Sequence, residues 1–293
     1  MKKTGIIPLF LKAKHRLFSK DKDVMAICSR NGAYEYLLRY KSACRNVETE
    51  FISPKEKIIW TCWLQGEENA PLIVRKCLDS IRQYAGDYKV VVLTQETISK
   101  YVEVPEYIER RHQRGIIPHA HYTDIVRLLL LIQYGGVWID STILLTGELP
   151  QYVTRTPLFV FRREPEGNVE MGLCLISSDK NHPILQTQLA LLLEYWKYEE
   201  TLVSYSIFHL FWTMVVRSSP KLQKLWKEVP YIPCAMLDIL MHDLSLPYSA
   251  SRWAEIQTLS PIHKLSYKFE QFGIDINKKS TFYDVLINGN KPC

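Results

Sequence analysis

Several motifs that define large enzyme classes are missing from the 293 residues of the chain. It contains no G-x-G-x-x-G fingerprint and no Walker loop, so the dinucleotide-binding and phosphate-loop folds lose their main sequence signals. No G-x-S-x-G elbow indicates Ser-His-Asp catalysis. The seven cysteines are odd in number and include no C-x-x-C pair. They argue against a disulfide framework or a zinc site and favour reduced, buried thiols.

Long apolar runs are also missing. No window reaches the roughly 20 apolar residues that span a bilayer, and residues 201–216, which come nearest, contain Ser, Thr, Tyr and His. A buried helix explains this segment better. A secretory signal is not evident, because charges return from Lys12 to Arg16 directly after the apolar residues 6–11. We therefore expect a cytoplasmic protein.

Positive charge is modest overall and is concentrated near the N-terminus. The formal net charge of +6 suits an anionic ligand or membrane surface but is too small to imply nucleic acid. Residues 1–55 are expected to form a basic, partly amphipathic helical extension, with basic residues at Lys12, Lys14, His15, Arg16, Lys20 and Lys22. This extension could lie on the inner face of the plasma membrane, where each basic residue contributes up to about 1 kcal/mol. Alternatively, it packs as a solvated helix on the main domain.

Residues 56–293 are predicted to form one α/β domain with helical C-terminal additions. A strand, a helix and a strand are expected within about forty residues, at 56–63, 70–84 and 89–94. This order is the signature of a βαβ unit with a parallel pair of strands. Further strands are expected at 137–139, 158–161 and 171–177, and helices at 182–198, 204–217 and 220–228. The polar residues 162–168 are expected to form a loop.

The most informative pattern lies in residues 119–142, which begin as a predicted helix and end as a strand. Asp124 and Arg127 are three residues apart, so their side chains extend from one face of the helix. The Gly135–Gly136 pair ends the helix, because glycine enters a left-handed conformation without a Cβ penalty. The short apolar strand that follows ends at Asp140, and in open α/β sheets ligands bind at that edge. Two acids and an arginine are therefore expected in one crevice.

The D-x-x-R pattern of Asp124 and Arg127, followed by the G-G-x-x-x-D pattern that ends at Asp140, resembles glycosyltransferases with a DXD sugar-binding region. More narrowly, it resembles the capsular polysaccharide synthesis branch of the family 32 glycosyltransferases. The match runs over residues 56–178, with a weaker echo at 262–268. The resemblance implies a GT-A-like fold, a Rossmann-type mixed sheet flanked by helices. It also implies transfer of a sugar from a nucleotide diphosphate donor with retention of anomeric configuration.

The resemblance implies roles for five residues. Asp140 would anchor the donor ribose and a divalent metal, Mn²⁺ or Mg²⁺, since these ions prefer oxygen ligands. The alternative for Asp140 is a loop aspartate that caps a neighbouring backbone amide. Asp124 and Arg127 would bind the hydroxyls of the donor sugar, although a simple helix ion pair is the alternative. Thr142 stands where the family has the second acid of D-x-D, and a threonine hydroxyl is a weak metal ligand. His263 could supply a further metal ligand, although a lone histidine is more often structural.

Other residues concern the nucleotide end of the donor. By the resemblance, Trp63 would stack on the base, with packing in the core as the alternative. Lys264 and Lys268 would share a face if their segment is helical, and there they could neutralise phosphate or simply be solvated. His119 and His121 have a spacing known for metal ligands, but no third ligand lies near them in the sequence. We expect them to line the crevice or begin the helix rather than bind zinc.

We therefore expect a glycosyltransferase that moves a sugar, a hexose or a related one, to a glycan or lipid-linked oligosaccharide in capsular or exopolysaccharide synthesis. Two alternatives remain open. Thr142, in place of an acid, suggests a relative that binds nucleotide sugar or glycan with weakened catalysis. The basic residues 1–55 suggest a peripheral membrane scaffold for a polysaccharide assembly complex.

Overall fold

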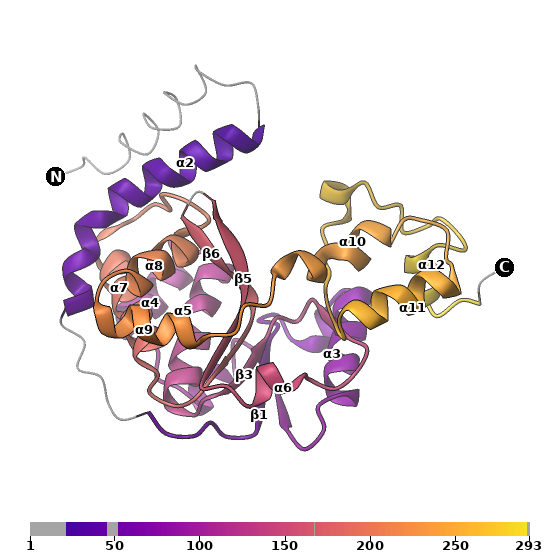
Figure 1. Cartoon of the computed structure of the whole chain (residues 1–293), viewed down its shortest axis with the longest axis horizontal. Helices are drawn as coiled ribbons and strands as arrows, with labels where there is room; N and C mark the ends of the chain where they lie inside the picture. The colour runs from indigo at the N-terminus through magenta and orange to yellow at the C-terminus, as the bar shows by residue number, and fades with distance from the viewer. Residues whose placement is uncertain (1–21, 46–51, 167, 292–293) are drawn as a thin grey trace.

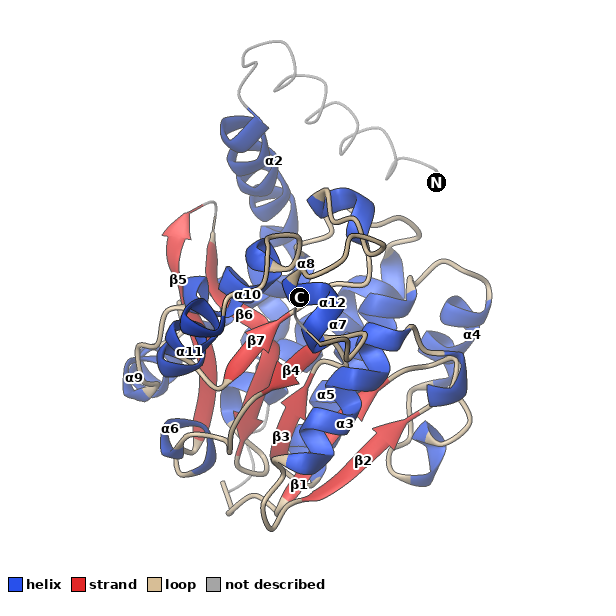
Figure 2. Cartoon of the chain, turned by 90° about the vertical axis from the view of Figure 1, so that its right-hand side faces the viewer, coloured by secondary structure: helices blue, strands red, loops and turns tan. Residues whose placement is uncertain are grey.

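A computed structural model describes residues 22–45, 52–166 and 168–291. Its central sheet has five strands in the order β2-β1-β3-β6-β5. These strands are β1 (Ile58–Cys62), β2 (Lys89–Leu93), β3 (Gly136–Ile139), β5 (Leu158–Glu166) and β6 (Val169–Ser178). A second sheet pairs β4 (Ile143–Leu145) with β7 (Ile262–Lys264). Figure 2 shows these strands in red behind α3, α11 and α12.

The central sheet is mixed. β1 is parallel to both β2 and β3, whereas β6 is antiparallel to β3 and β5. Helix α3 (Leu72–Gln83) connects β1 to β2, so the predicted βαβ unit with a parallel pair is confirmed. The predicted α/β class, a mixed sheet flanked by helices, is confirmed as well.

Side chains that alternate along the strands divide the interior into two cores. Ile59 and Val137 lie in one core, and Trp60 and Trp138 in the other, because successive residues of a strand point to opposite faces. Helices cover both faces of the sheet (Figure 1). The helices on the tryptophan face are α4 (Glu106–Gln113), α5 (His119–Gln133), α7 (Pro183–Tyr198), α8 (Ile207–Val216) and α9 (Pro220–Glu228). Those on the opposite face are α3, α10 (Ile239–Asp243), α11 (Ala250–Leu259) and α12 (Phe282–Leu286), and the short α6 (Gln151–Thr154) precedes β5.

The glycine pair turns the chain from α5 into β3, as predicted. Gly135 has φ +65° and Gly136 has φ +98°, a region that favours glycine. A Cβ atom on Gly136 would lie 2.5 Å from the carbonyl oxygen of Ile58 on the neighbouring strand. The pair therefore permits both the turn and the close approach of β3 to β1.

The described part of the N-terminal extension packs on the main domain. It consists of α2 (Lys22–Leu37) and the 3-10 helix η1 (Leu38–Arg45), which contact α7 and α8. The hydroxyls of Tyr36 and Tyr40 both donate hydrogen bonds to the Glu199 carboxylate, at 2.7 and 2.5 Å. The basic residues from Lys12 to Lys20 lie outside the described residues. Within the described ranges, no helix combines the length and apolar character needed to cross a bilayer.

One expectation about local structure is wrong, and one condition set in the sequence analysis is not met. The polar residues 162–168 are not a loop as a whole, because β5 continues to Glu166 and pairs with β6 there. Polar residues are tolerated in this part of the strand, where the Arg162 guanidinium lies 3.7 Å from the centre of the Trp226 ring. Lys264 is not in a helix with Lys268 but ends β7, because pairing with β4 fixes an extended backbone.

Candidate active site

A cavity of about 520 Å³ lies at the carboxyl ends of the parallel strands β1 and β3. Trp63, which follows β1, and Asp140, which follows β3, both line it. The first turns of α5 add His121 and Asp124. The rest of the wall comes from distant segments and includes Arg163, Leu173, Tyr205, His209, Asp238, Lys264 and Tyr267. This is the position where open α/β sheets bind ligands.

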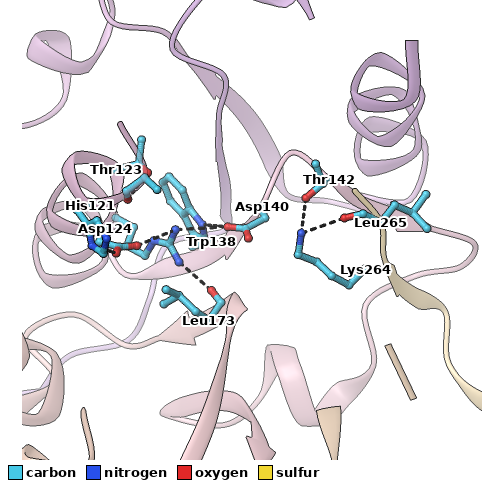
Figure 3. Close-up of polar contacts among 11 residues, drawn as sticks. His121, Thr123, Asp124, Trp138, Asp140, Thr142, Leu173, Lys264 and Leu265 are labelled. Atoms are coloured by element: carbon cyan, nitrogen blue, oxygen red, sulfur yellow. Dashed lines mark hydrogen bonds and ion pairs between the residues drawn. The ribbon is translucent and has the colours of Figure 1, made fainter. Parts of the chain in front are cut away.

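Arg127 links the two predicted acids in this cavity. Its Nη2 lies 3.2 Å from Oδ1 of Asp124 and 3.4 Å from Oδ1 of Asp140, and its Nη1 donates to the Leu173 carbonyl at 2.8 Å. The side chains of Asp124 and Arg127 are each only 6% exposed. Figure 3 shows Asp124 and Asp140 on either side of Trp138. The structure thus brings the acids and the arginine to one cavity, as the helix, turn and strand pattern predicts.

Asp140 is held in a fixed orientation. Its Oδ1 also accepts a hydrogen bond of 2.9 Å from Nε1 of Trp138, and its backbone N–H donates to the Cys174 carbonyl at 2.9 Å. The Asp140 side chain is 26% exposed, and its Oδ2 accepts no hydrogen bond from the described residues. One carboxylate oxygen is therefore fixed by the protein and the other remains for a ligand.

The two histidines of the H-x-H pattern have different partners. His121 is buried, its Nδ1 lies 3.4 Å from Oδ2 of Asp124, and neither ring nitrogen makes a hydrogen bond to the described residues. His119 instead contacts His112, with 2.8 Å between His119 Nδ1 and His112 Nε2. Burial, reinforced by His119, lowers the pKa of His112 to about 4. Both residues of the pattern line the cavity at the start of α5, as expected.

Thr142 and Lys264 form a direct contact beside Asp140. The Lys264 ammonium donates to Oγ1 of Thr142 at 2.6 Å and to the carbonyl of Leu265 at 3.1 Å (Figure 3). Both Thr142 and Lys264 line the cavity. Lys268 is exposed and does not line it. Of the two predicted phosphate-binding lysines, the structure places Lys264 in the site and leaves Lys268 outside it.

His263 faces away from the cavity. It is fully buried, its Nε2 lies 3.0 Å from Oγ1 of Thr146, and its ring is 5.8 Å from that of Trp253. Burial lowers the pKa of His263 to about 4, so the imidazole is neutral near pH 7. Along β7, His263 and Lys264 point to opposite faces, and only Lys264 lines the cavity. The structure therefore does not bring His263 together with Asp140.

The nucleotide end of the predicted site contains aromatic rings and inert thiols. Trp63 is half-buried at the cavity wall and packs edge to face on Tyr267, with ring centres 5.3 Å apart.

Burial raises the pKa of both Cys62 and Cys174 to about 12, so these thiols are protonated near pH 7. A cysteine nucleophile is thus not indicated at this site.

Comparisons with known proteins bear on what this site does. The family described as "Capsular polysaccharide synthesis protein" matches residues 28–286. The chain belongs to this family. It is also 30% identical over 104 residues to the O-glycosyltransferase braB of Annulohypoxylon truncatum, a match that covers 32% of this chain and 25% of that protein. Among solved structures, "PaToxG Glycosyltransferase" is similar with a TM-score of 0.42 and 15% identity, over 89% of this chain and 92% of that one.

The resemblance implies a divalent metal, and the donor atoms of this family member do not fit a metal bound in the D-x-D manner. Asp140 offers a cation its Oδ2, since Oδ1 already accepts from Trp138 and Arg127, and the Thr142 hydroxyl, which stands where a second acid is expected, already accepts from an ammonium. In the described ranges, no group of three or more His, Cys, Asp or Glu side chains could hold a metal ion. A cation at the Thr142 hydroxyl would have to displace Lys264 or lie against it.

Several cavity residues of this family member were not identified from the sequence. Arg163 comes from β5, Tyr205 and His209 from the segment around the start of α8, and Asp238 from the end of the 3-10 helix η4 (Cys234–Asp238). Burial lowers the pKa of His209 to about 4, and burial raises that of Asp238. These residues belong to no short motif, and only the tertiary fold brings them together. Trp138, in contrast, lies inside the G-G-x-x-x-D pattern and could have been found there.

Proposed function

We propose that this protein is a glycosyltransferase that moves a sugar from a nucleoside diphosphate donor to a glycan acceptor in capsular or exopolysaccharide synthesis. One observation carries the proposal: Asp124, Arg127 and Asp140 meet in one cavity at the carboxyl ends of β1 and β3. Membership of the capsular polysaccharide synthesis family supports it. The cavity, of about 520 Å³, falls in the usual range of roughly 300–1,000 Å³ for small-molecule sites.

The polar groups of the cavity match the parts of such a donor. Oδ2 of Asp140 can accept hydrogen bonds from sugar or ribose hydroxyls, while Arg127 holds the other oxygen in place. Asp124 orients Arg127 and lies beside His121 at the sugar end of the cavity. Trp63 offers an aromatic face to the base, at the end of the cavity that Tyr267 also lines. We propose a hexose as the sugar and retention as the stereochemical outcome, following the family resemblance.

In the transfer, the oxygen of an acceptor hydroxyl forms a bond to the anomeric carbon, and the bond from that carbon to the diphosphate breaks. The electron pair of the broken bond stays on the diphosphate, and the hydroxyl proton is released. Charge therefore grows on the leaving phosphate, and cationic groups close to it lower the barrier. Without an acceptor, water can take the place of the acceptor hydroxyl. The donor is then slowly hydrolysed to the free sugar and the nucleoside diphosphate.

The test is hydrolysis and transfer with a panel of nucleoside diphosphate sugars, read as release of the nucleoside diphosphate. We expect one donor or a small group of donors to be cleaved, and Asp140→Asn to lower the rate on the order of 100-fold. Asp87→Asn is the matched control, because Asp87 is an exposed acid that pairs with Lys57 far from the cavity. If the wild-type protein binds a donor but never cleaves it, the binding-only alternative is favoured. If no nucleotide sugar binds at all, the proposal is wrong.

A further inference from the structure

The diphosphate of a sugar nucleotide needs positive charge beside it, and proteins supply this charge in two ways. A divalent metal held by carboxylates can bridge the two phosphates, or basic side chains can bind them directly. The two arrangements need different surrounding atoms. A metal ion needs protein oxygen atoms whose lone pairs are not already used. A lysine ammonium needs hydrogen-bond acceptors in the protein that hold it near the phosphate.

The atoms around Asp140 fit the second arrangement. In D-x-D enzymes, by the resemblance, the position of Thr142 is an acid. Here its hydroxyl oxygen accepts a hydrogen bond of 2.6 Å from the Lys264 ammonium. Asp238 also lines the cavity, but the cations of Arg163 and Lys264 both act on its carboxyl group. A divalent ion at Oδ2 of Asp140 would therefore find, at the second position of the pattern, a hydroxyl that is already bonded to an ammonium instead of a second carboxylate.

Lys264 is held where a phosphate-binding cation is needed. It ends β7, which pairs with β4 directly after Asp140, with Lys264 opposite Ile143. The next residue, Leu265, donates its backbone N–H to the Thr142 carbonyl at 2.8 Å, which locks the two segments together. An ammonium has three donors, and those of Lys264 meet two acceptors, Oγ1 of Thr142 and the Leu265 carbonyl. One donor therefore remains for a phosphate oxygen.

We propose that Lys264 replaces the divalent metal in this protein: its ammonium, positioned by Thr142, binds the diphosphate of the donor and neutralises the leaving group. The inference rests on the proposed function, since it concerns the same cavity. In the transfer step, the electron pair of the cleaved bond to the anomeric carbon stays on a phosphate oxygen beside Lys264, and the proton of the acceptor hydroxyl leaves to solvent. Arg163, which also lines the cavity and, like Lys264, acts on the Asp238 carboxyl group, adds a second positive charge.

The experiment measures binding of a panel of nucleoside diphosphates to the full chain by calorimetry, once with EDTA and once with Mn²⁺. We expect at least one nucleoside diphosphate to bind in EDTA with an affinity within about threefold of that in Mn²⁺. Lys264→Gln should weaken this binding by about 10- to 100-fold, the usual contribution of a hydrogen bond to a charged group. Lys268→Gln is the matched control, since it removes an exposed lysine four residues away and should leave binding unchanged.

A second variant keeps the test informative if Lys264→Gln folds poorly. Thr142→Val removes the hydroxyl but keeps both the side-chain shape and the ammonium. It should weaken binding less than Lys264→Gln and leave binding insensitive to EDTA. If a nucleoside diphosphate binds only with Mn²⁺, or if Lys264→Gln binds as tightly as the wild-type protein, the inference about Lys264 is overturned while the proposed function stands. If no nucleoside diphosphate binds with or without Mn²⁺, the proposed function itself fails.

Discussion

The Arg127 guanidinium lies 3.4 Å from the Asp140 carboxylate, although Arg127 is in the middle of α5 and Asp140 follows β3. The same guanidinium lies 3.2 Å from Asp124. The guanidinium therefore connects the helix to the strand end, and it neutralises the Asp124 carboxylate, which is almost entirely buried. Arg127 thus affects both the stability of the fold and the geometry of the cavity, and the two effects can be separated by mutation.

Replacement of Arg127 by methionine should destabilise the protein by about 3–5 kcal/mol, because it leaves the buried Asp124 carboxylate without its cation. Urea unfolding measures this loss. The double variant Asp124→Asn with Arg127→Met should recover part of the stability, since no buried charge is then left unpaired.

Arg127→Lys should retain more stability than Arg127→Met but still lose donor cleavage. A single ammonium cannot reproduce the contacts of the guanidinium fork to two carboxylates and the Leu173 carbonyl. Equal stability of both single variants would contradict this account.

A second prediction concerns the turn between α5 and β3. Gly136→Ala should cost more than about 2 kcal/mol of stability, since it combines backbone strain with a Cβ placed 2.5 Å from the Ile58 carbonyl oxygen. Gly86→Ala is the control: Gly86 also has a positive φ, +60°, but a Cβ there meets nothing within 4 Å. It should cost only about 1–2 kcal/mol from strain alone. Thermal unfolding of the two variants checks the difference, and equal losses would remove the proposed clash with β1.

The positions of Asp124, Arg127 and Asp140 could be predicted from the sequence. The three residues belong to one continuous helix, turn and strand unit. Asp124 and Arg127 share a helix face by their spacing, and the glycine pair fixes where the strand must begin. The position of Asp140 at the strand end then follows. Local periodicity and turn chemistry therefore determine this half of the site.

The other half depends on tertiary structure. Asp238 and Arg163 reach the cavity only because η4 and β5 pack beside it, and no spacing in the sequence indicates that proximity. Whether His263 or Lys264 reaches the cavity depends on the backbone conformation of their segment. In the strand that forms, adjacent side chains point to opposite faces, so Lys264 lines the cavity and His263 is buried behind it. Pairing with β4, more than a hundred residues earlier, decides this outcome.

Trp63 provides a test of base stacking against simple packing. Trp63→Ala should weaken nucleoside diphosphate binding by about 10- to 100-fold if the indole stacks on the base. Trp63→Phe keeps an aromatic face and should retain most of the affinity. Tyr267→Phe, which removes only the hydroxyl of the ring packed on Trp63, serves as the control and should bind normally. If Trp63→Ala lowers the unfolding temperature without changing affinity, Trp63 is a packing residue and the base lies elsewhere.

The last prediction concerns acid sensitivity. Burial, reinforced by Lys55, lowers the pKa of His182 to about 4, and burial likewise lowers the pKa of His263 to about 4. A histidine with a lowered folded-state pKa takes up its proton more readily when unfolded. Its contribution to stability is therefore complete above the unfolded pKa near 6.5 and is lost as the pH falls from about 6.5 towards 4.

His182 allows this contribution to be measured separately, because its Nδ1 caps α7 by accepting a hydrogen bond of 3.3 Å from the backbone N–H of Ile184. Asparagine is a favoured N-cap residue but does not titrate, so His182→Asn should keep the cap. The wild-type protein should lose about 2 kcal/mol more than His182→Asn between about pH 7.5 and about pH 5, as measured by urea unfolding at both values. Parallel losses in the two proteins would mean that folding does not lower the pKa of His182, so that the folded protein takes up this proton as readily as the unfolded chain. The buried Lys55 ammonium close to the ring makes that protonation unfavourable.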